Sequence, residues 1–400
     1  MRHALDDILV IDTSQFLSGP WCSTLLADMG AKVIKIEPKV GEAMRLYTYM
    51  NRNLEAMLSL LHRNKFGMTL DLRTAKGKEI FKKLIAKADI YVDNFTPGVL
   101  EKLNLGYDVL KEINPRLIYV SISGFGRTGP YHSHPAFDII AQATGGIMYV
   151  SERMDRQPAL FFADTLSGIF GALGAMQALY YREKTGKGQI VDISMQDVMY
   201  AINTNAIVKA LFERLFSDKD REKIGLKSKA GEASIKLPLY NSYPTRNGYV
   251  VIVALTDRQV RRLFNTMGRP DLIKSRKFSS IIKRLKNIDE LDEEIRKWTL
   301  QHTVEEILNL LHKNHIPCAP VYDLDQVNKD PQLKDRGMFQ EISHERIGRI
   351  RVPGIIIKLS ESPGEIIRPA PKLGEHNDQI LKELGYTINE IKEFKNNGII

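Results

Sequence analysis

The N-terminal part of the chain alternates between two hydrophobic periodicities, and this alternation limits the fold more than any other feature. Short apolar runs rich in Ile and Val predict strands at 8–11, 32–36, 68–72, 90–92 and 117–121. Helical periodicity separates them at 21–29, 74–86 and 98–113. Strands that alternate with helices predict an α/β fold with a mostly parallel sheet covered on both faces. Ligands of such sheets bind at the carboxyl ends of the strands, which directs attention to the turns at 13–20, 37–45, 93–97 and 123–130.

Beyond this region the pattern changes twice. Residues 164–182 predict a long helix in which small residues recur at helical spacing, so its backbone is expected to pack close to a neighbour. A strand at 190–193 and a helix at 195–216 precede a Lys-rich linker at 217–236. A smaller unit with its own strand and helices then occupies 237–321. The expected large domain therefore combines 1–216 with 322–400.

Composition excludes several classes of protein. The two cysteines, Cys22 and Cys318, lie in no metal or redox spacing, and this usage is typical of a reducing cytosol, so a cytoplasmic location is expected. No secretion signal and no run of 18 apolar residues is present, which predicts no membrane association. The net charge is +9, but basic and acidic residues are interleaved as on solvated helix faces. Nucleic-acid binding is therefore not expected, whereas a small polyanion remains a plausible ligand.

Two aspartates are candidates for chemistry. Asp164 follows an apolar run and opens the helix with the small residues. This position is typical of an N-cap aspartate, but a carboxylate aimed into a pocket at a helix N-terminus could also act as a nucleophile. Asp138 presents the same choice between a second acid and a helix cap. No phosphate loop, Rossmann glycine triplet, HExxH or GxSxG motif is present, so the residues alone indicate only an α/β enzyme with a cleft suited to a polyanion.

A succession of short motifs makes the sequence more specific. In order they are IDTS (11–14), SGPWC (18–22), LADMGAKVIKIEP (26–38), RNK (63–65), LDL (70–72), DNFTPG (93–98), SGFG (123–126), TGP (128–130), FD (137–138), AD (163–164), KTGKGQ (184–189), SMQD (194–197), DPQL (330–333), RGM (336–338) and GEH (374–376). Each motif is weak alone, but their order over nearly the whole chain is specific. The sequence resembles the family III CoA-transferases of the CaiB/BaiF type, formyl-CoA transferase among them.

The resemblance implies an architecture and a reaction. It implies a Rossmann-like large domain built from both chain ends, a smaller α+β domain, and a homodimer whose two chains interlock. The family's catalytic aspartate falls on Asp164, with Asp138 as a second acid at the site. An aspartyl-CoA thioester would carry CoA from an acyl-CoA to a free carboxylic acid, with no metal and no tightly bound cofactor. We expect the Asp164 carboxylate to be ionised at neutral pH and to need no general base.

The resemblance also implies CoA contacts. They fall on Leu17, Ser18, Lys65, Asn94, Phe95, Lys102 and Met195, with Phe137 beside them. Lys65 is expected to contact a phosphate. Where some family members carry an arginine after the Lys35–Glu37 segment, this chain has Pro38 and Lys39, so Lys39 and Arg45 are candidates for the adenosine phosphate. The glycine-rich loop that shields the intermediate in formyl-CoA transferase is not visible between 225 and 260, which disfavours oxalate and formate.

Two other functions remain open. An α-methylacyl-CoA racemase shares this fold, but it needs two bases on opposite sides of the α-carbon. Its histidine falls where this chain has Phe137, and the nearest alternative is His134, three residues away. A non-catalytic basic binding protein is the more remote alternative, and it predicts no use for Asp164.

Overall fold

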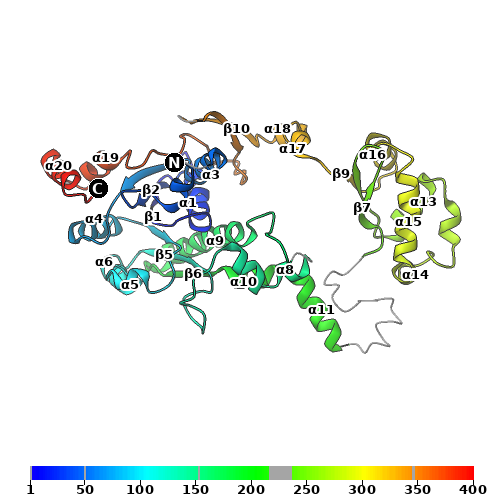
Figure 1. The fold of residues 1–400 in the computed structure, drawn as a ribbon, viewed down its shortest axis with the longest axis horizontal. Coiled ribbons are helices and arrows are strands. Elements are labelled where there is room, and N and C mark those ends of the chain that lie inside the picture. The colour runs from blue at the N-terminus through cyan, green and yellow to red at the C-terminus, as the bar shows by residue number, and fades with distance from the viewer. Residues whose placement is uncertain (1, 49–50, 152–153, 216–236, 345–346) are drawn as a thin grey trace. The chain divides into compact units, whose positions relative to one another are not determined.

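The computed structural model describes residues 2–48, 51–151, 154–215, 237–344 and 347–400. Contacts divide the chain into two compact units (Figure 1). The first comprises Met1–Met148, Arg153–Asn203 and Pro331–Ile400, and the second comprises Tyr149–Glu152 and Thr204–Asp330. The contact boundaries thus fall after 203 and 330, whereas the sequence suggested 216 and 321. The expected linker at 217–236 lies outside the described residues.

The first unit is built on a six-stranded parallel sheet with the order β3-β2-β1-β4-β5-β6. Its strands are β1 (Leu9–Asp12), β2 (Lys32–Glu37), β3 (Lys65–Thr69), β4 (Ile90–Asp93), β5 (Ile118–Ser123) and β6 (Ile190–Ser194). β1 pairs with β2 on one side and β4 on the other, so the strand order reverses beside β1. The α/β fold with a parallel sheet is therefore confirmed, in the doubly wound strand order of Rossmann-like domains.

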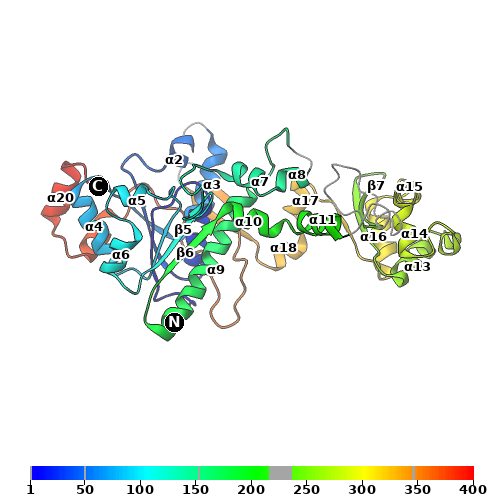
Figure 2. The same ribbon diagram turned by 90° about the horizontal axis from the view of Figure 1, so that it is seen from below.

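Successive residues of β1 and β2 enter opposite cores, as buried parallel strands require. Val10 and Val33 pack in the core under α1 (Ser18–Asp28), α9 (Phe162–Thr185) and α10 (Met195–Ile202). Their neighbours Ile11 and Ile34 pack in the other core. The helices of that second face are α4 (Ala75–Ile85), α5 (Val99–Lys102), α6 (Tyr107–Ile113), α19 (Asn377–Glu383) and α20 (Ile388–Asn396). Figure 2 shows α20 beside α4, so both ends of the chain contribute to this unit.

Three expected elements differ from the structure. β3 begins three residues earlier than expected, directly after Asn64, which adopts a left-handed φ of 64°. The helix expected at 98–113 is two helices, α5 and α6, because Asn104 between them has a φ of 57°. The helix expected at 195–216 is divided at Asn203, which has a φ of −80° and a ψ of 52°, into α10 and α11 (Thr204–Leu215). Asparagine tolerates the left-handed conformation of Asn64 and Asn104 better than most residues do, and hydrophobic periodicity does not register such breaks.

The close packing expected of the small-residue helix is confirmed. A Cβ added at Gly168 of α9 would lie 2.6 Å from the carbonyl oxygen of Ser18, and one at Gly174 would lie 2.5 Å from Val191. Neither position therefore accepts a side chain without displacing a neighbour. This packing brings the N-terminal turn of α9 against the start of α1.

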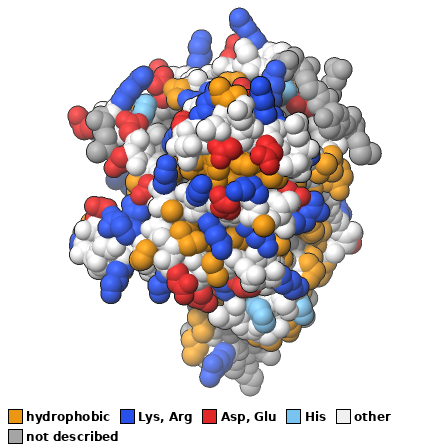
Figure 3. Space-filling model, turned by 90° about the vertical axis from the view of Figure 1, so that its left-hand side faces the viewer, with side chains coloured by type: hydrophobic (Ala, Val, Ile, Leu, Met, Phe, Trp, Pro, Cys, Tyr) orange, Lys and Arg blue, Asp and Glu red, His pale blue; other side chains and the backbone are white. Residues whose placement is uncertain are grey.

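The remaining elements of the first unit are short. They are α2 (Ala43–Thr48), α3 (Arg52–His62), α7 (Asp138–Thr144), α18 (Pro331–Asp335) and the antiparallel pair β10 (Phe339–His344) and β11 (Gly348–Pro353). α8 (Ile147–Val150) spans the boundary between the units. Figure 3 shows Lys and Arg side chains interleaved with Asp and Glu on one face, as the sequence predicts.

The second unit is α+β. Its antiparallel sheet has the order β7-β8-β9, formed by Tyr240–Pro244, Tyr249–Val253 and Cys318–Pro320. Around one apolar core lie the helices α13 (Asp257–Thr266), η1 (Pro270–Lys274), α14 (Ile281–Lys286), α15 (Ile288–Thr299) and α16 (Val304–Lys313), and α17 (Leu324–Val327) follows. Among the described residues of either unit, no helix combines the length and hydropathy needed to cross a bilayer.

Candidate active site

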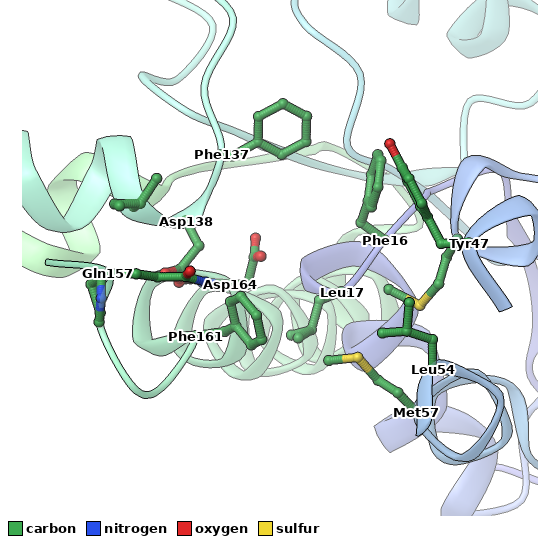
Figure 4. Close-up of a pocket in the computed structure, with 13 residues that line it drawn as sticks. Phe16, Leu17, Tyr47, Leu54, Met57, Phe137, Asp138, Gln157, Phe161 and Asp164 are labelled. Atoms are coloured by element: carbon green, nitrogen blue, oxygen red, sulfur yellow. Dashed lines mark hydrogen bonds between the residues drawn. The ribbon is translucent and has the colours of Figure 1, made fainter. Parts of the chain in front are cut away.

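Asp164 lies in the first turn of α9 and faces a cavity of about 500 Å³. The helix begins at Phe162 after an N-cap residue, Phe161, that makes no side-chain capping bond. The interpretation of Asp164 as the N-cap is therefore wrong, because it is the third residue of the helix. Figure 4 shows its carboxylate pointing into the cavity, below the ring of Phe137.

The cavity is walled mainly by hydrocarbon. It is lined by Phe16, Leu17, Met44, Tyr47, Leu54, Met57, Phe137, Asp138, Ile139, Gln157, Pro158, Phe161 and Asp164. The only charged side chains in this lining are two carboxylates, Asp138 and Asp164. The rings of Phe16 and Phe137 meet edge to face, with centroids 5.4 Å apart. The cavity therefore joins a carboxylate pair to an apolar wall.

Asp138 binds the backbone of Asp164. Its Oδ1 accepts a hydrogen bond from the Asp164 N–H at 3.1 Å, and its Oδ2 accepts one from Gln142 Nε2 at 2.6 Å. Gln142 also donates to the Leu160 carbonyl oxygen at 2.9 Å. Asp138 is itself the first residue of α7, yet its carboxylate satisfies a free N–H of α9. The sequence left Asp138 as either a second acid or a helix cap. In the structure it is a cap, but it caps α9 instead of its own helix α7.

The environment raises the pKa of both carboxyl groups. Burial, followed by the nearby charge of Asp138, raises the pKa of Asp164 to about 7, against a lowering by the Ser18 hydroxyl. Burial also raises the pKa of Asp138, although hydrogen bonds from Asp164 and Gln142 oppose it. The expectation that Asp164 is fully ionised at neutral pH is therefore wrong for the unliganded protein, because apolar walls disfavour the charged form.

A second cavity, of about 400 Å³, lies along the same turn. Thr13 and Gln15 line it, whereas Phe16 and Leu17 line the cavity of Asp164. The turn between β1 and α1 therefore borders both spaces at the carboxyl ends of the strands, where an open α/β sheet binds its ligands. Lys39 and Phe95 line the second cavity, as does Arg73, which sequence reasoning missed. Arg73 follows the carboxyl end of β3, a position that the parallel-sheet rule could have singled out.

Several expected CoA contacts lie near these cavities without facing them. Ser18 is buried beside Asp164. The Asn94 side chain binds both the N–H and the carbonyl of Gln15, at 2.8 and 2.7 Å, so it fixes the shared turn. Lys102 is exposed at the end of α5, and Met195 is buried at the start of α10.

Two expected phosphate contacts are engaged elsewhere, so these expectations are corrected. The Lys65 ammonium is fully buried and donates to Asp12 at 3.1 Å, Ser23 at 2.8 Å and the Pro20 carbonyl at 2.9 Å. The Arg45 guanidinium donates twice to Glu37, at 2.6 and 2.7 Å. Each cation is neutralised by a buried carboxylate. The basic side chains that line the second cavity are Lys39 and Arg73, and the exposed Arg73 guanidinium itself donates to Asp71 at 2.9 and 2.8 Å.

A histidine base for racemisation is not found at the Asp164 cavity. None of the described residues that line it is a histidine. His134 is exposed and stacks against Tyr131, with ring centroids 5.3 Å apart, and His132 binds the Gly129 carbonyl. The described geometry thus gives no support to the two-base alternative.

The sequence matches the model of CoA-transferase family III over residues 5–377. The chain belongs to this family. It is 35% identical to the succinyl-CoA–L-malate CoA-transferase beta subunit of Chloroflexus aurantiacus, over 99% of this chain and 98% of that one. It is also 35% identical to the succinyl-CoA:mesaconate CoA-transferase of Haloarcula hispanica, over 96% of each. The crystal structure of a CaiB/BaiF family protein from Brucella suis is similar to this chain with a TM-score of 0.79 and 30% identity, covering 96% of this chain and 100% of that one.

Proposed function

We propose that this family III CoA-transferase moves CoA from an acyl-CoA thioester to a free carboxylic acid through a covalent thioester on Asp164. One observation carries the proposal: the Asp164 carboxylate faces an apolar cavity where burial raises its pKa to about 7. A carboxylate with a raised pKa is a stronger nucleophile once ionised, and an apolar site removes the water that would weaken it.

The proposed reaction proceeds by four acyl transfers. A carboxylate oxygen of Asp164 attacks the thioester carbon, the C–S bond breaks, and CoA leaves as the thiolate. The thiolate attacks the aspartyl carbonyl of the resulting anhydride and releases the donor acid as its carboxylate. The acceptor carboxylate then attacks the aspartyl-CoA thioester, and the freed thiolate attacks the acceptor carbonyl. Asp164 returns to a carboxylate, and no net proton or water is consumed.

The backbone of the first turn of α9 is partly engaged already. Free N–H groups at a helix N-terminus can stabilise developing oxyanions. The Asp164 N–H already donates to Asp138. In the proposed mechanism Asp138 therefore fixes the backbone of the nucleophile, and its charge keeps the nucleophile's pKa high.

The two cavities suggest how CoA would bind. Phe95 offers an aromatic surface for the adenine, and Lys39 offers positive charge to the phosphates in the second cavity. Arg73 would have to leave Asp71 to do the same. The pantetheine arm would then follow the shared turn at 13–17 toward Asp164. Because two relatives are named as succinyl-CoA transferases, succinyl-CoA is the first donor to test.

A homodimer is also part of the proposal. On the outer face of α9, Ile169, Leu173, Met176 and Tyr180 recur at helical spacing and are 40–66% exposed. An exposed apolar stripe on a long helix is typical of a surface that another chain covers. A compact monomer in sedimentation at micromolar concentration would remove this part of the proposal. A cytoplasmic location rests on the cysteine usage alone.

The test is CoA exchange by Asp164→Ala. We expect at least a thousandfold loss of transfer from succinyl-CoA to a panel of carboxylic acids, with the fold retained. Asp108→Ala, which removes an exposed aspartate from the first turn of α6, serves as the matched control. Trapping the wild type with hydroxylamine in the presence of acyl-CoA should modify Asp164. Full activity of Asp164→Ala would refute the assigned role, and rapid α-deuterium exchange in 2-methylacyl-CoA would favour the racemase.

A further inference from the structure

The turn that borders both cavities adopts a conformation that its sequence does not favour. Phe16, which lines the Asp164 cavity, has a φ of 60°. A bulky residue is disfavoured in this left-handed region, so surrounding groups must impose the conformation. The Phe16 ring packs against Phe137, so the strained backbone also sets one wall of the cavity.

Glu42 supplies the contact that faces this strained residue. It lies between β2 and α2 and is 1% exposed. Its Oε2 accepts a hydrogen bond from the Phe16 N–H at 2.8 Å, and its Oε1 lies 2.7 Å from His62 Nε2. Burial opposes ionisation, but Lys35 and His62 lower the pKa of Glu42 to about 2, so it is a carboxylate at neutral pH.

His62 holds the other oxygen of the Glu42 carboxylate. Burial lowers the pKa of His62 to about 4, so the imidazole is neutral and its Nε2–H donates to Glu42. Its Nδ1 is buried and has no hydrogen-bond partner among the described residues. A neutral imidazole can move its proton to the other nitrogen, so His62 could also accept a hydrogen bond at Nε2.

We propose that Glu42 is a positioning residue for the active site, which holds the Phe16 backbone so that the turn keeps its course between the two cavities. Glu42 lines neither cavity, so it acts on the Asp164 cavity through Phe16. In this role the position of the acceptor oxygen, at the end of a side chain as long as that of glutamate, matters more than its negative charge. The inference rests on the proposed CoA transfer for its kinetic consequence.

Two variants separate the reach of the Glu42 side chain from its charge. Glu42→Gln keeps an oxygen at the right distance and loses the charge, and His62 can accept from the new amide. Glu42→Asp keeps the charge and withdraws the oxygen by one methylene. We expect Glu42→Gln to retain kcat within about threefold, and Glu42→Asp to lose about tenfold or more with a smaller change in KM for the acceptor acid, since misplacement of about 1 Å is costly in an oriented site.

A matched control removes the charge of another buried carboxylate. Asp28 is 4% exposed and binds Arg63 and Asn64, remote from the Asp164 cavity. Asp28→Asn should lower the urea midpoint and leave kcat unchanged. If Glu42→Gln loses more activity than Glu42→Asp, or if both lose only stability as Asp28→Asn does, the positioning role is wrong.

Amide exchange separates this inference from the proposed reaction. The Phe16 N–H should exchange with deuterium at least tenfold faster in Glu42→Asp than in Glu42→Gln or wild type, because only the shortened side chain frees it. Unchanged exchange in Glu42→Asp would overturn the inference even in an active enzyme. If the Phe16 N–H exchanges faster in Glu42→Asp but the wild type transfers no CoA, the proposed function is refuted and the contact remains established.

Discussion

The buried Asp12 and the half-buried Asp164 of the first unit have opposite electrostatic environments. At the centre of the sheet, burial would raise the pKa of Asp12, but Lys35 and Lys65 hold it well below its usual range. At the cavity, burial and the neighbouring Asp138 act in the same direction and raise the pKa of Asp164 to about 7. Burial is common to both sites, so the sign of the neighbouring charge decides the outcome.

The difference separates a structural carboxylate from the proposed nucleophile. Asp12 lies 3.1 Å from the Lys65 ammonium and 3.8 Å from that of Lys35, and it also accepts from Ser23 at 2.6 Å. The side chains of Asp12, Lys35 and Lys65 are fully buried. Asp164 faces open space and, among the residues that line it, no cation compensates its charge. A perturbed carboxyl group in a cavity is typical of a functional site.

The largest expected effect follows from breaking the ion cluster. Asp12→Ala leaves Lys35 and Lys65 buried without their carboxylate, and removing one partner of such a group costs about 3–5 kcal/mol. We expect a correspondingly lower urea midpoint. Glu383→Ala, which removes the exposed ion pair with Lys32, should cost less than about 1 kcal/mol. Equal midpoints for the two variants would show that the buried ion cluster contributes no more to stability than the exposed ion pair does.

The pH dependence of transfer should reveal the raised pKa at the cavity. Only ionised Asp164 can attack a thioester, so kcat/KM should rise with pH up to about 7 and level off above it. The rise between pH 5 and pH 7 should approach fiftyfold, since about one carboxyl in a hundred is ionised two units below its pKa. A flat profile from pH 5 to 8 would show that the nucleophile has an ordinary pKa.

The sequence indicated the sheet well and the electrostatic roles poorly. Val/Ile runs between helical segments define β1, β2, β4 and β5 within a residue or two, because burial on both faces leaves a strong local signal. Lys65 carries no such signal. Its partner Asp12 is 53 positions away, and only the pairing of strands brings the two together. Sequence therefore could not distinguish a lysine neutralised in the core from one free to bind phosphate.

The carboxylates of the cavity show the same limit. Motif order placed Asp164 at the site, whereas its position alone favoured an N-cap. The cap for α9 comes instead from Asp138, 26 positions earlier, and the raised pKa depends on apolar side chains from several separate segments. Such an environment exists only after folding, so the assumption of a fully ionised aspartate at neutral pH failed.

A smaller effect is expected on the free energy of unfolding. Its dependence on pH has opposite signs for Asp164, whose pKa is raised, and Asp12, whose pKa is lowered. The folded protein binds a proton on Asp164 more tightly than the unfolded chain does, so this group reduces stability as pH rises from about 4 to about 7. Asp164→Asn should therefore be more stable than wild type at pH 8, by roughly 1–2 kcal/mol after solvent screening, and the gain should shrink toward pH 5. Urea titrations at both pH values measure it. If Asp164→Asn is less stable than wild type at pH 8, the surroundings of Asp164 do not disfavour its charged form.

The smallest effect tests the coupling inside the carboxylate pair. Asp138→Asn removes the neighbouring charge, so the pKa of Asp164 should fall and the midpoint of the kcat/KM profile should move to lower pH by less than about one unit. The asparagine oxygen can still accept from the Asp164 N–H. Its NH2 group, however, would face Gln142 Nε2, a donor that in the wild type is satisfied by the Asp138 carboxylate. That mismatch should lower the plateau without affecting the midpoint. The two measurements thus distinguish the electrostatic role of Asp138 from its role as a cap, and a midpoint that moves to higher pH would contradict the electrostatic one.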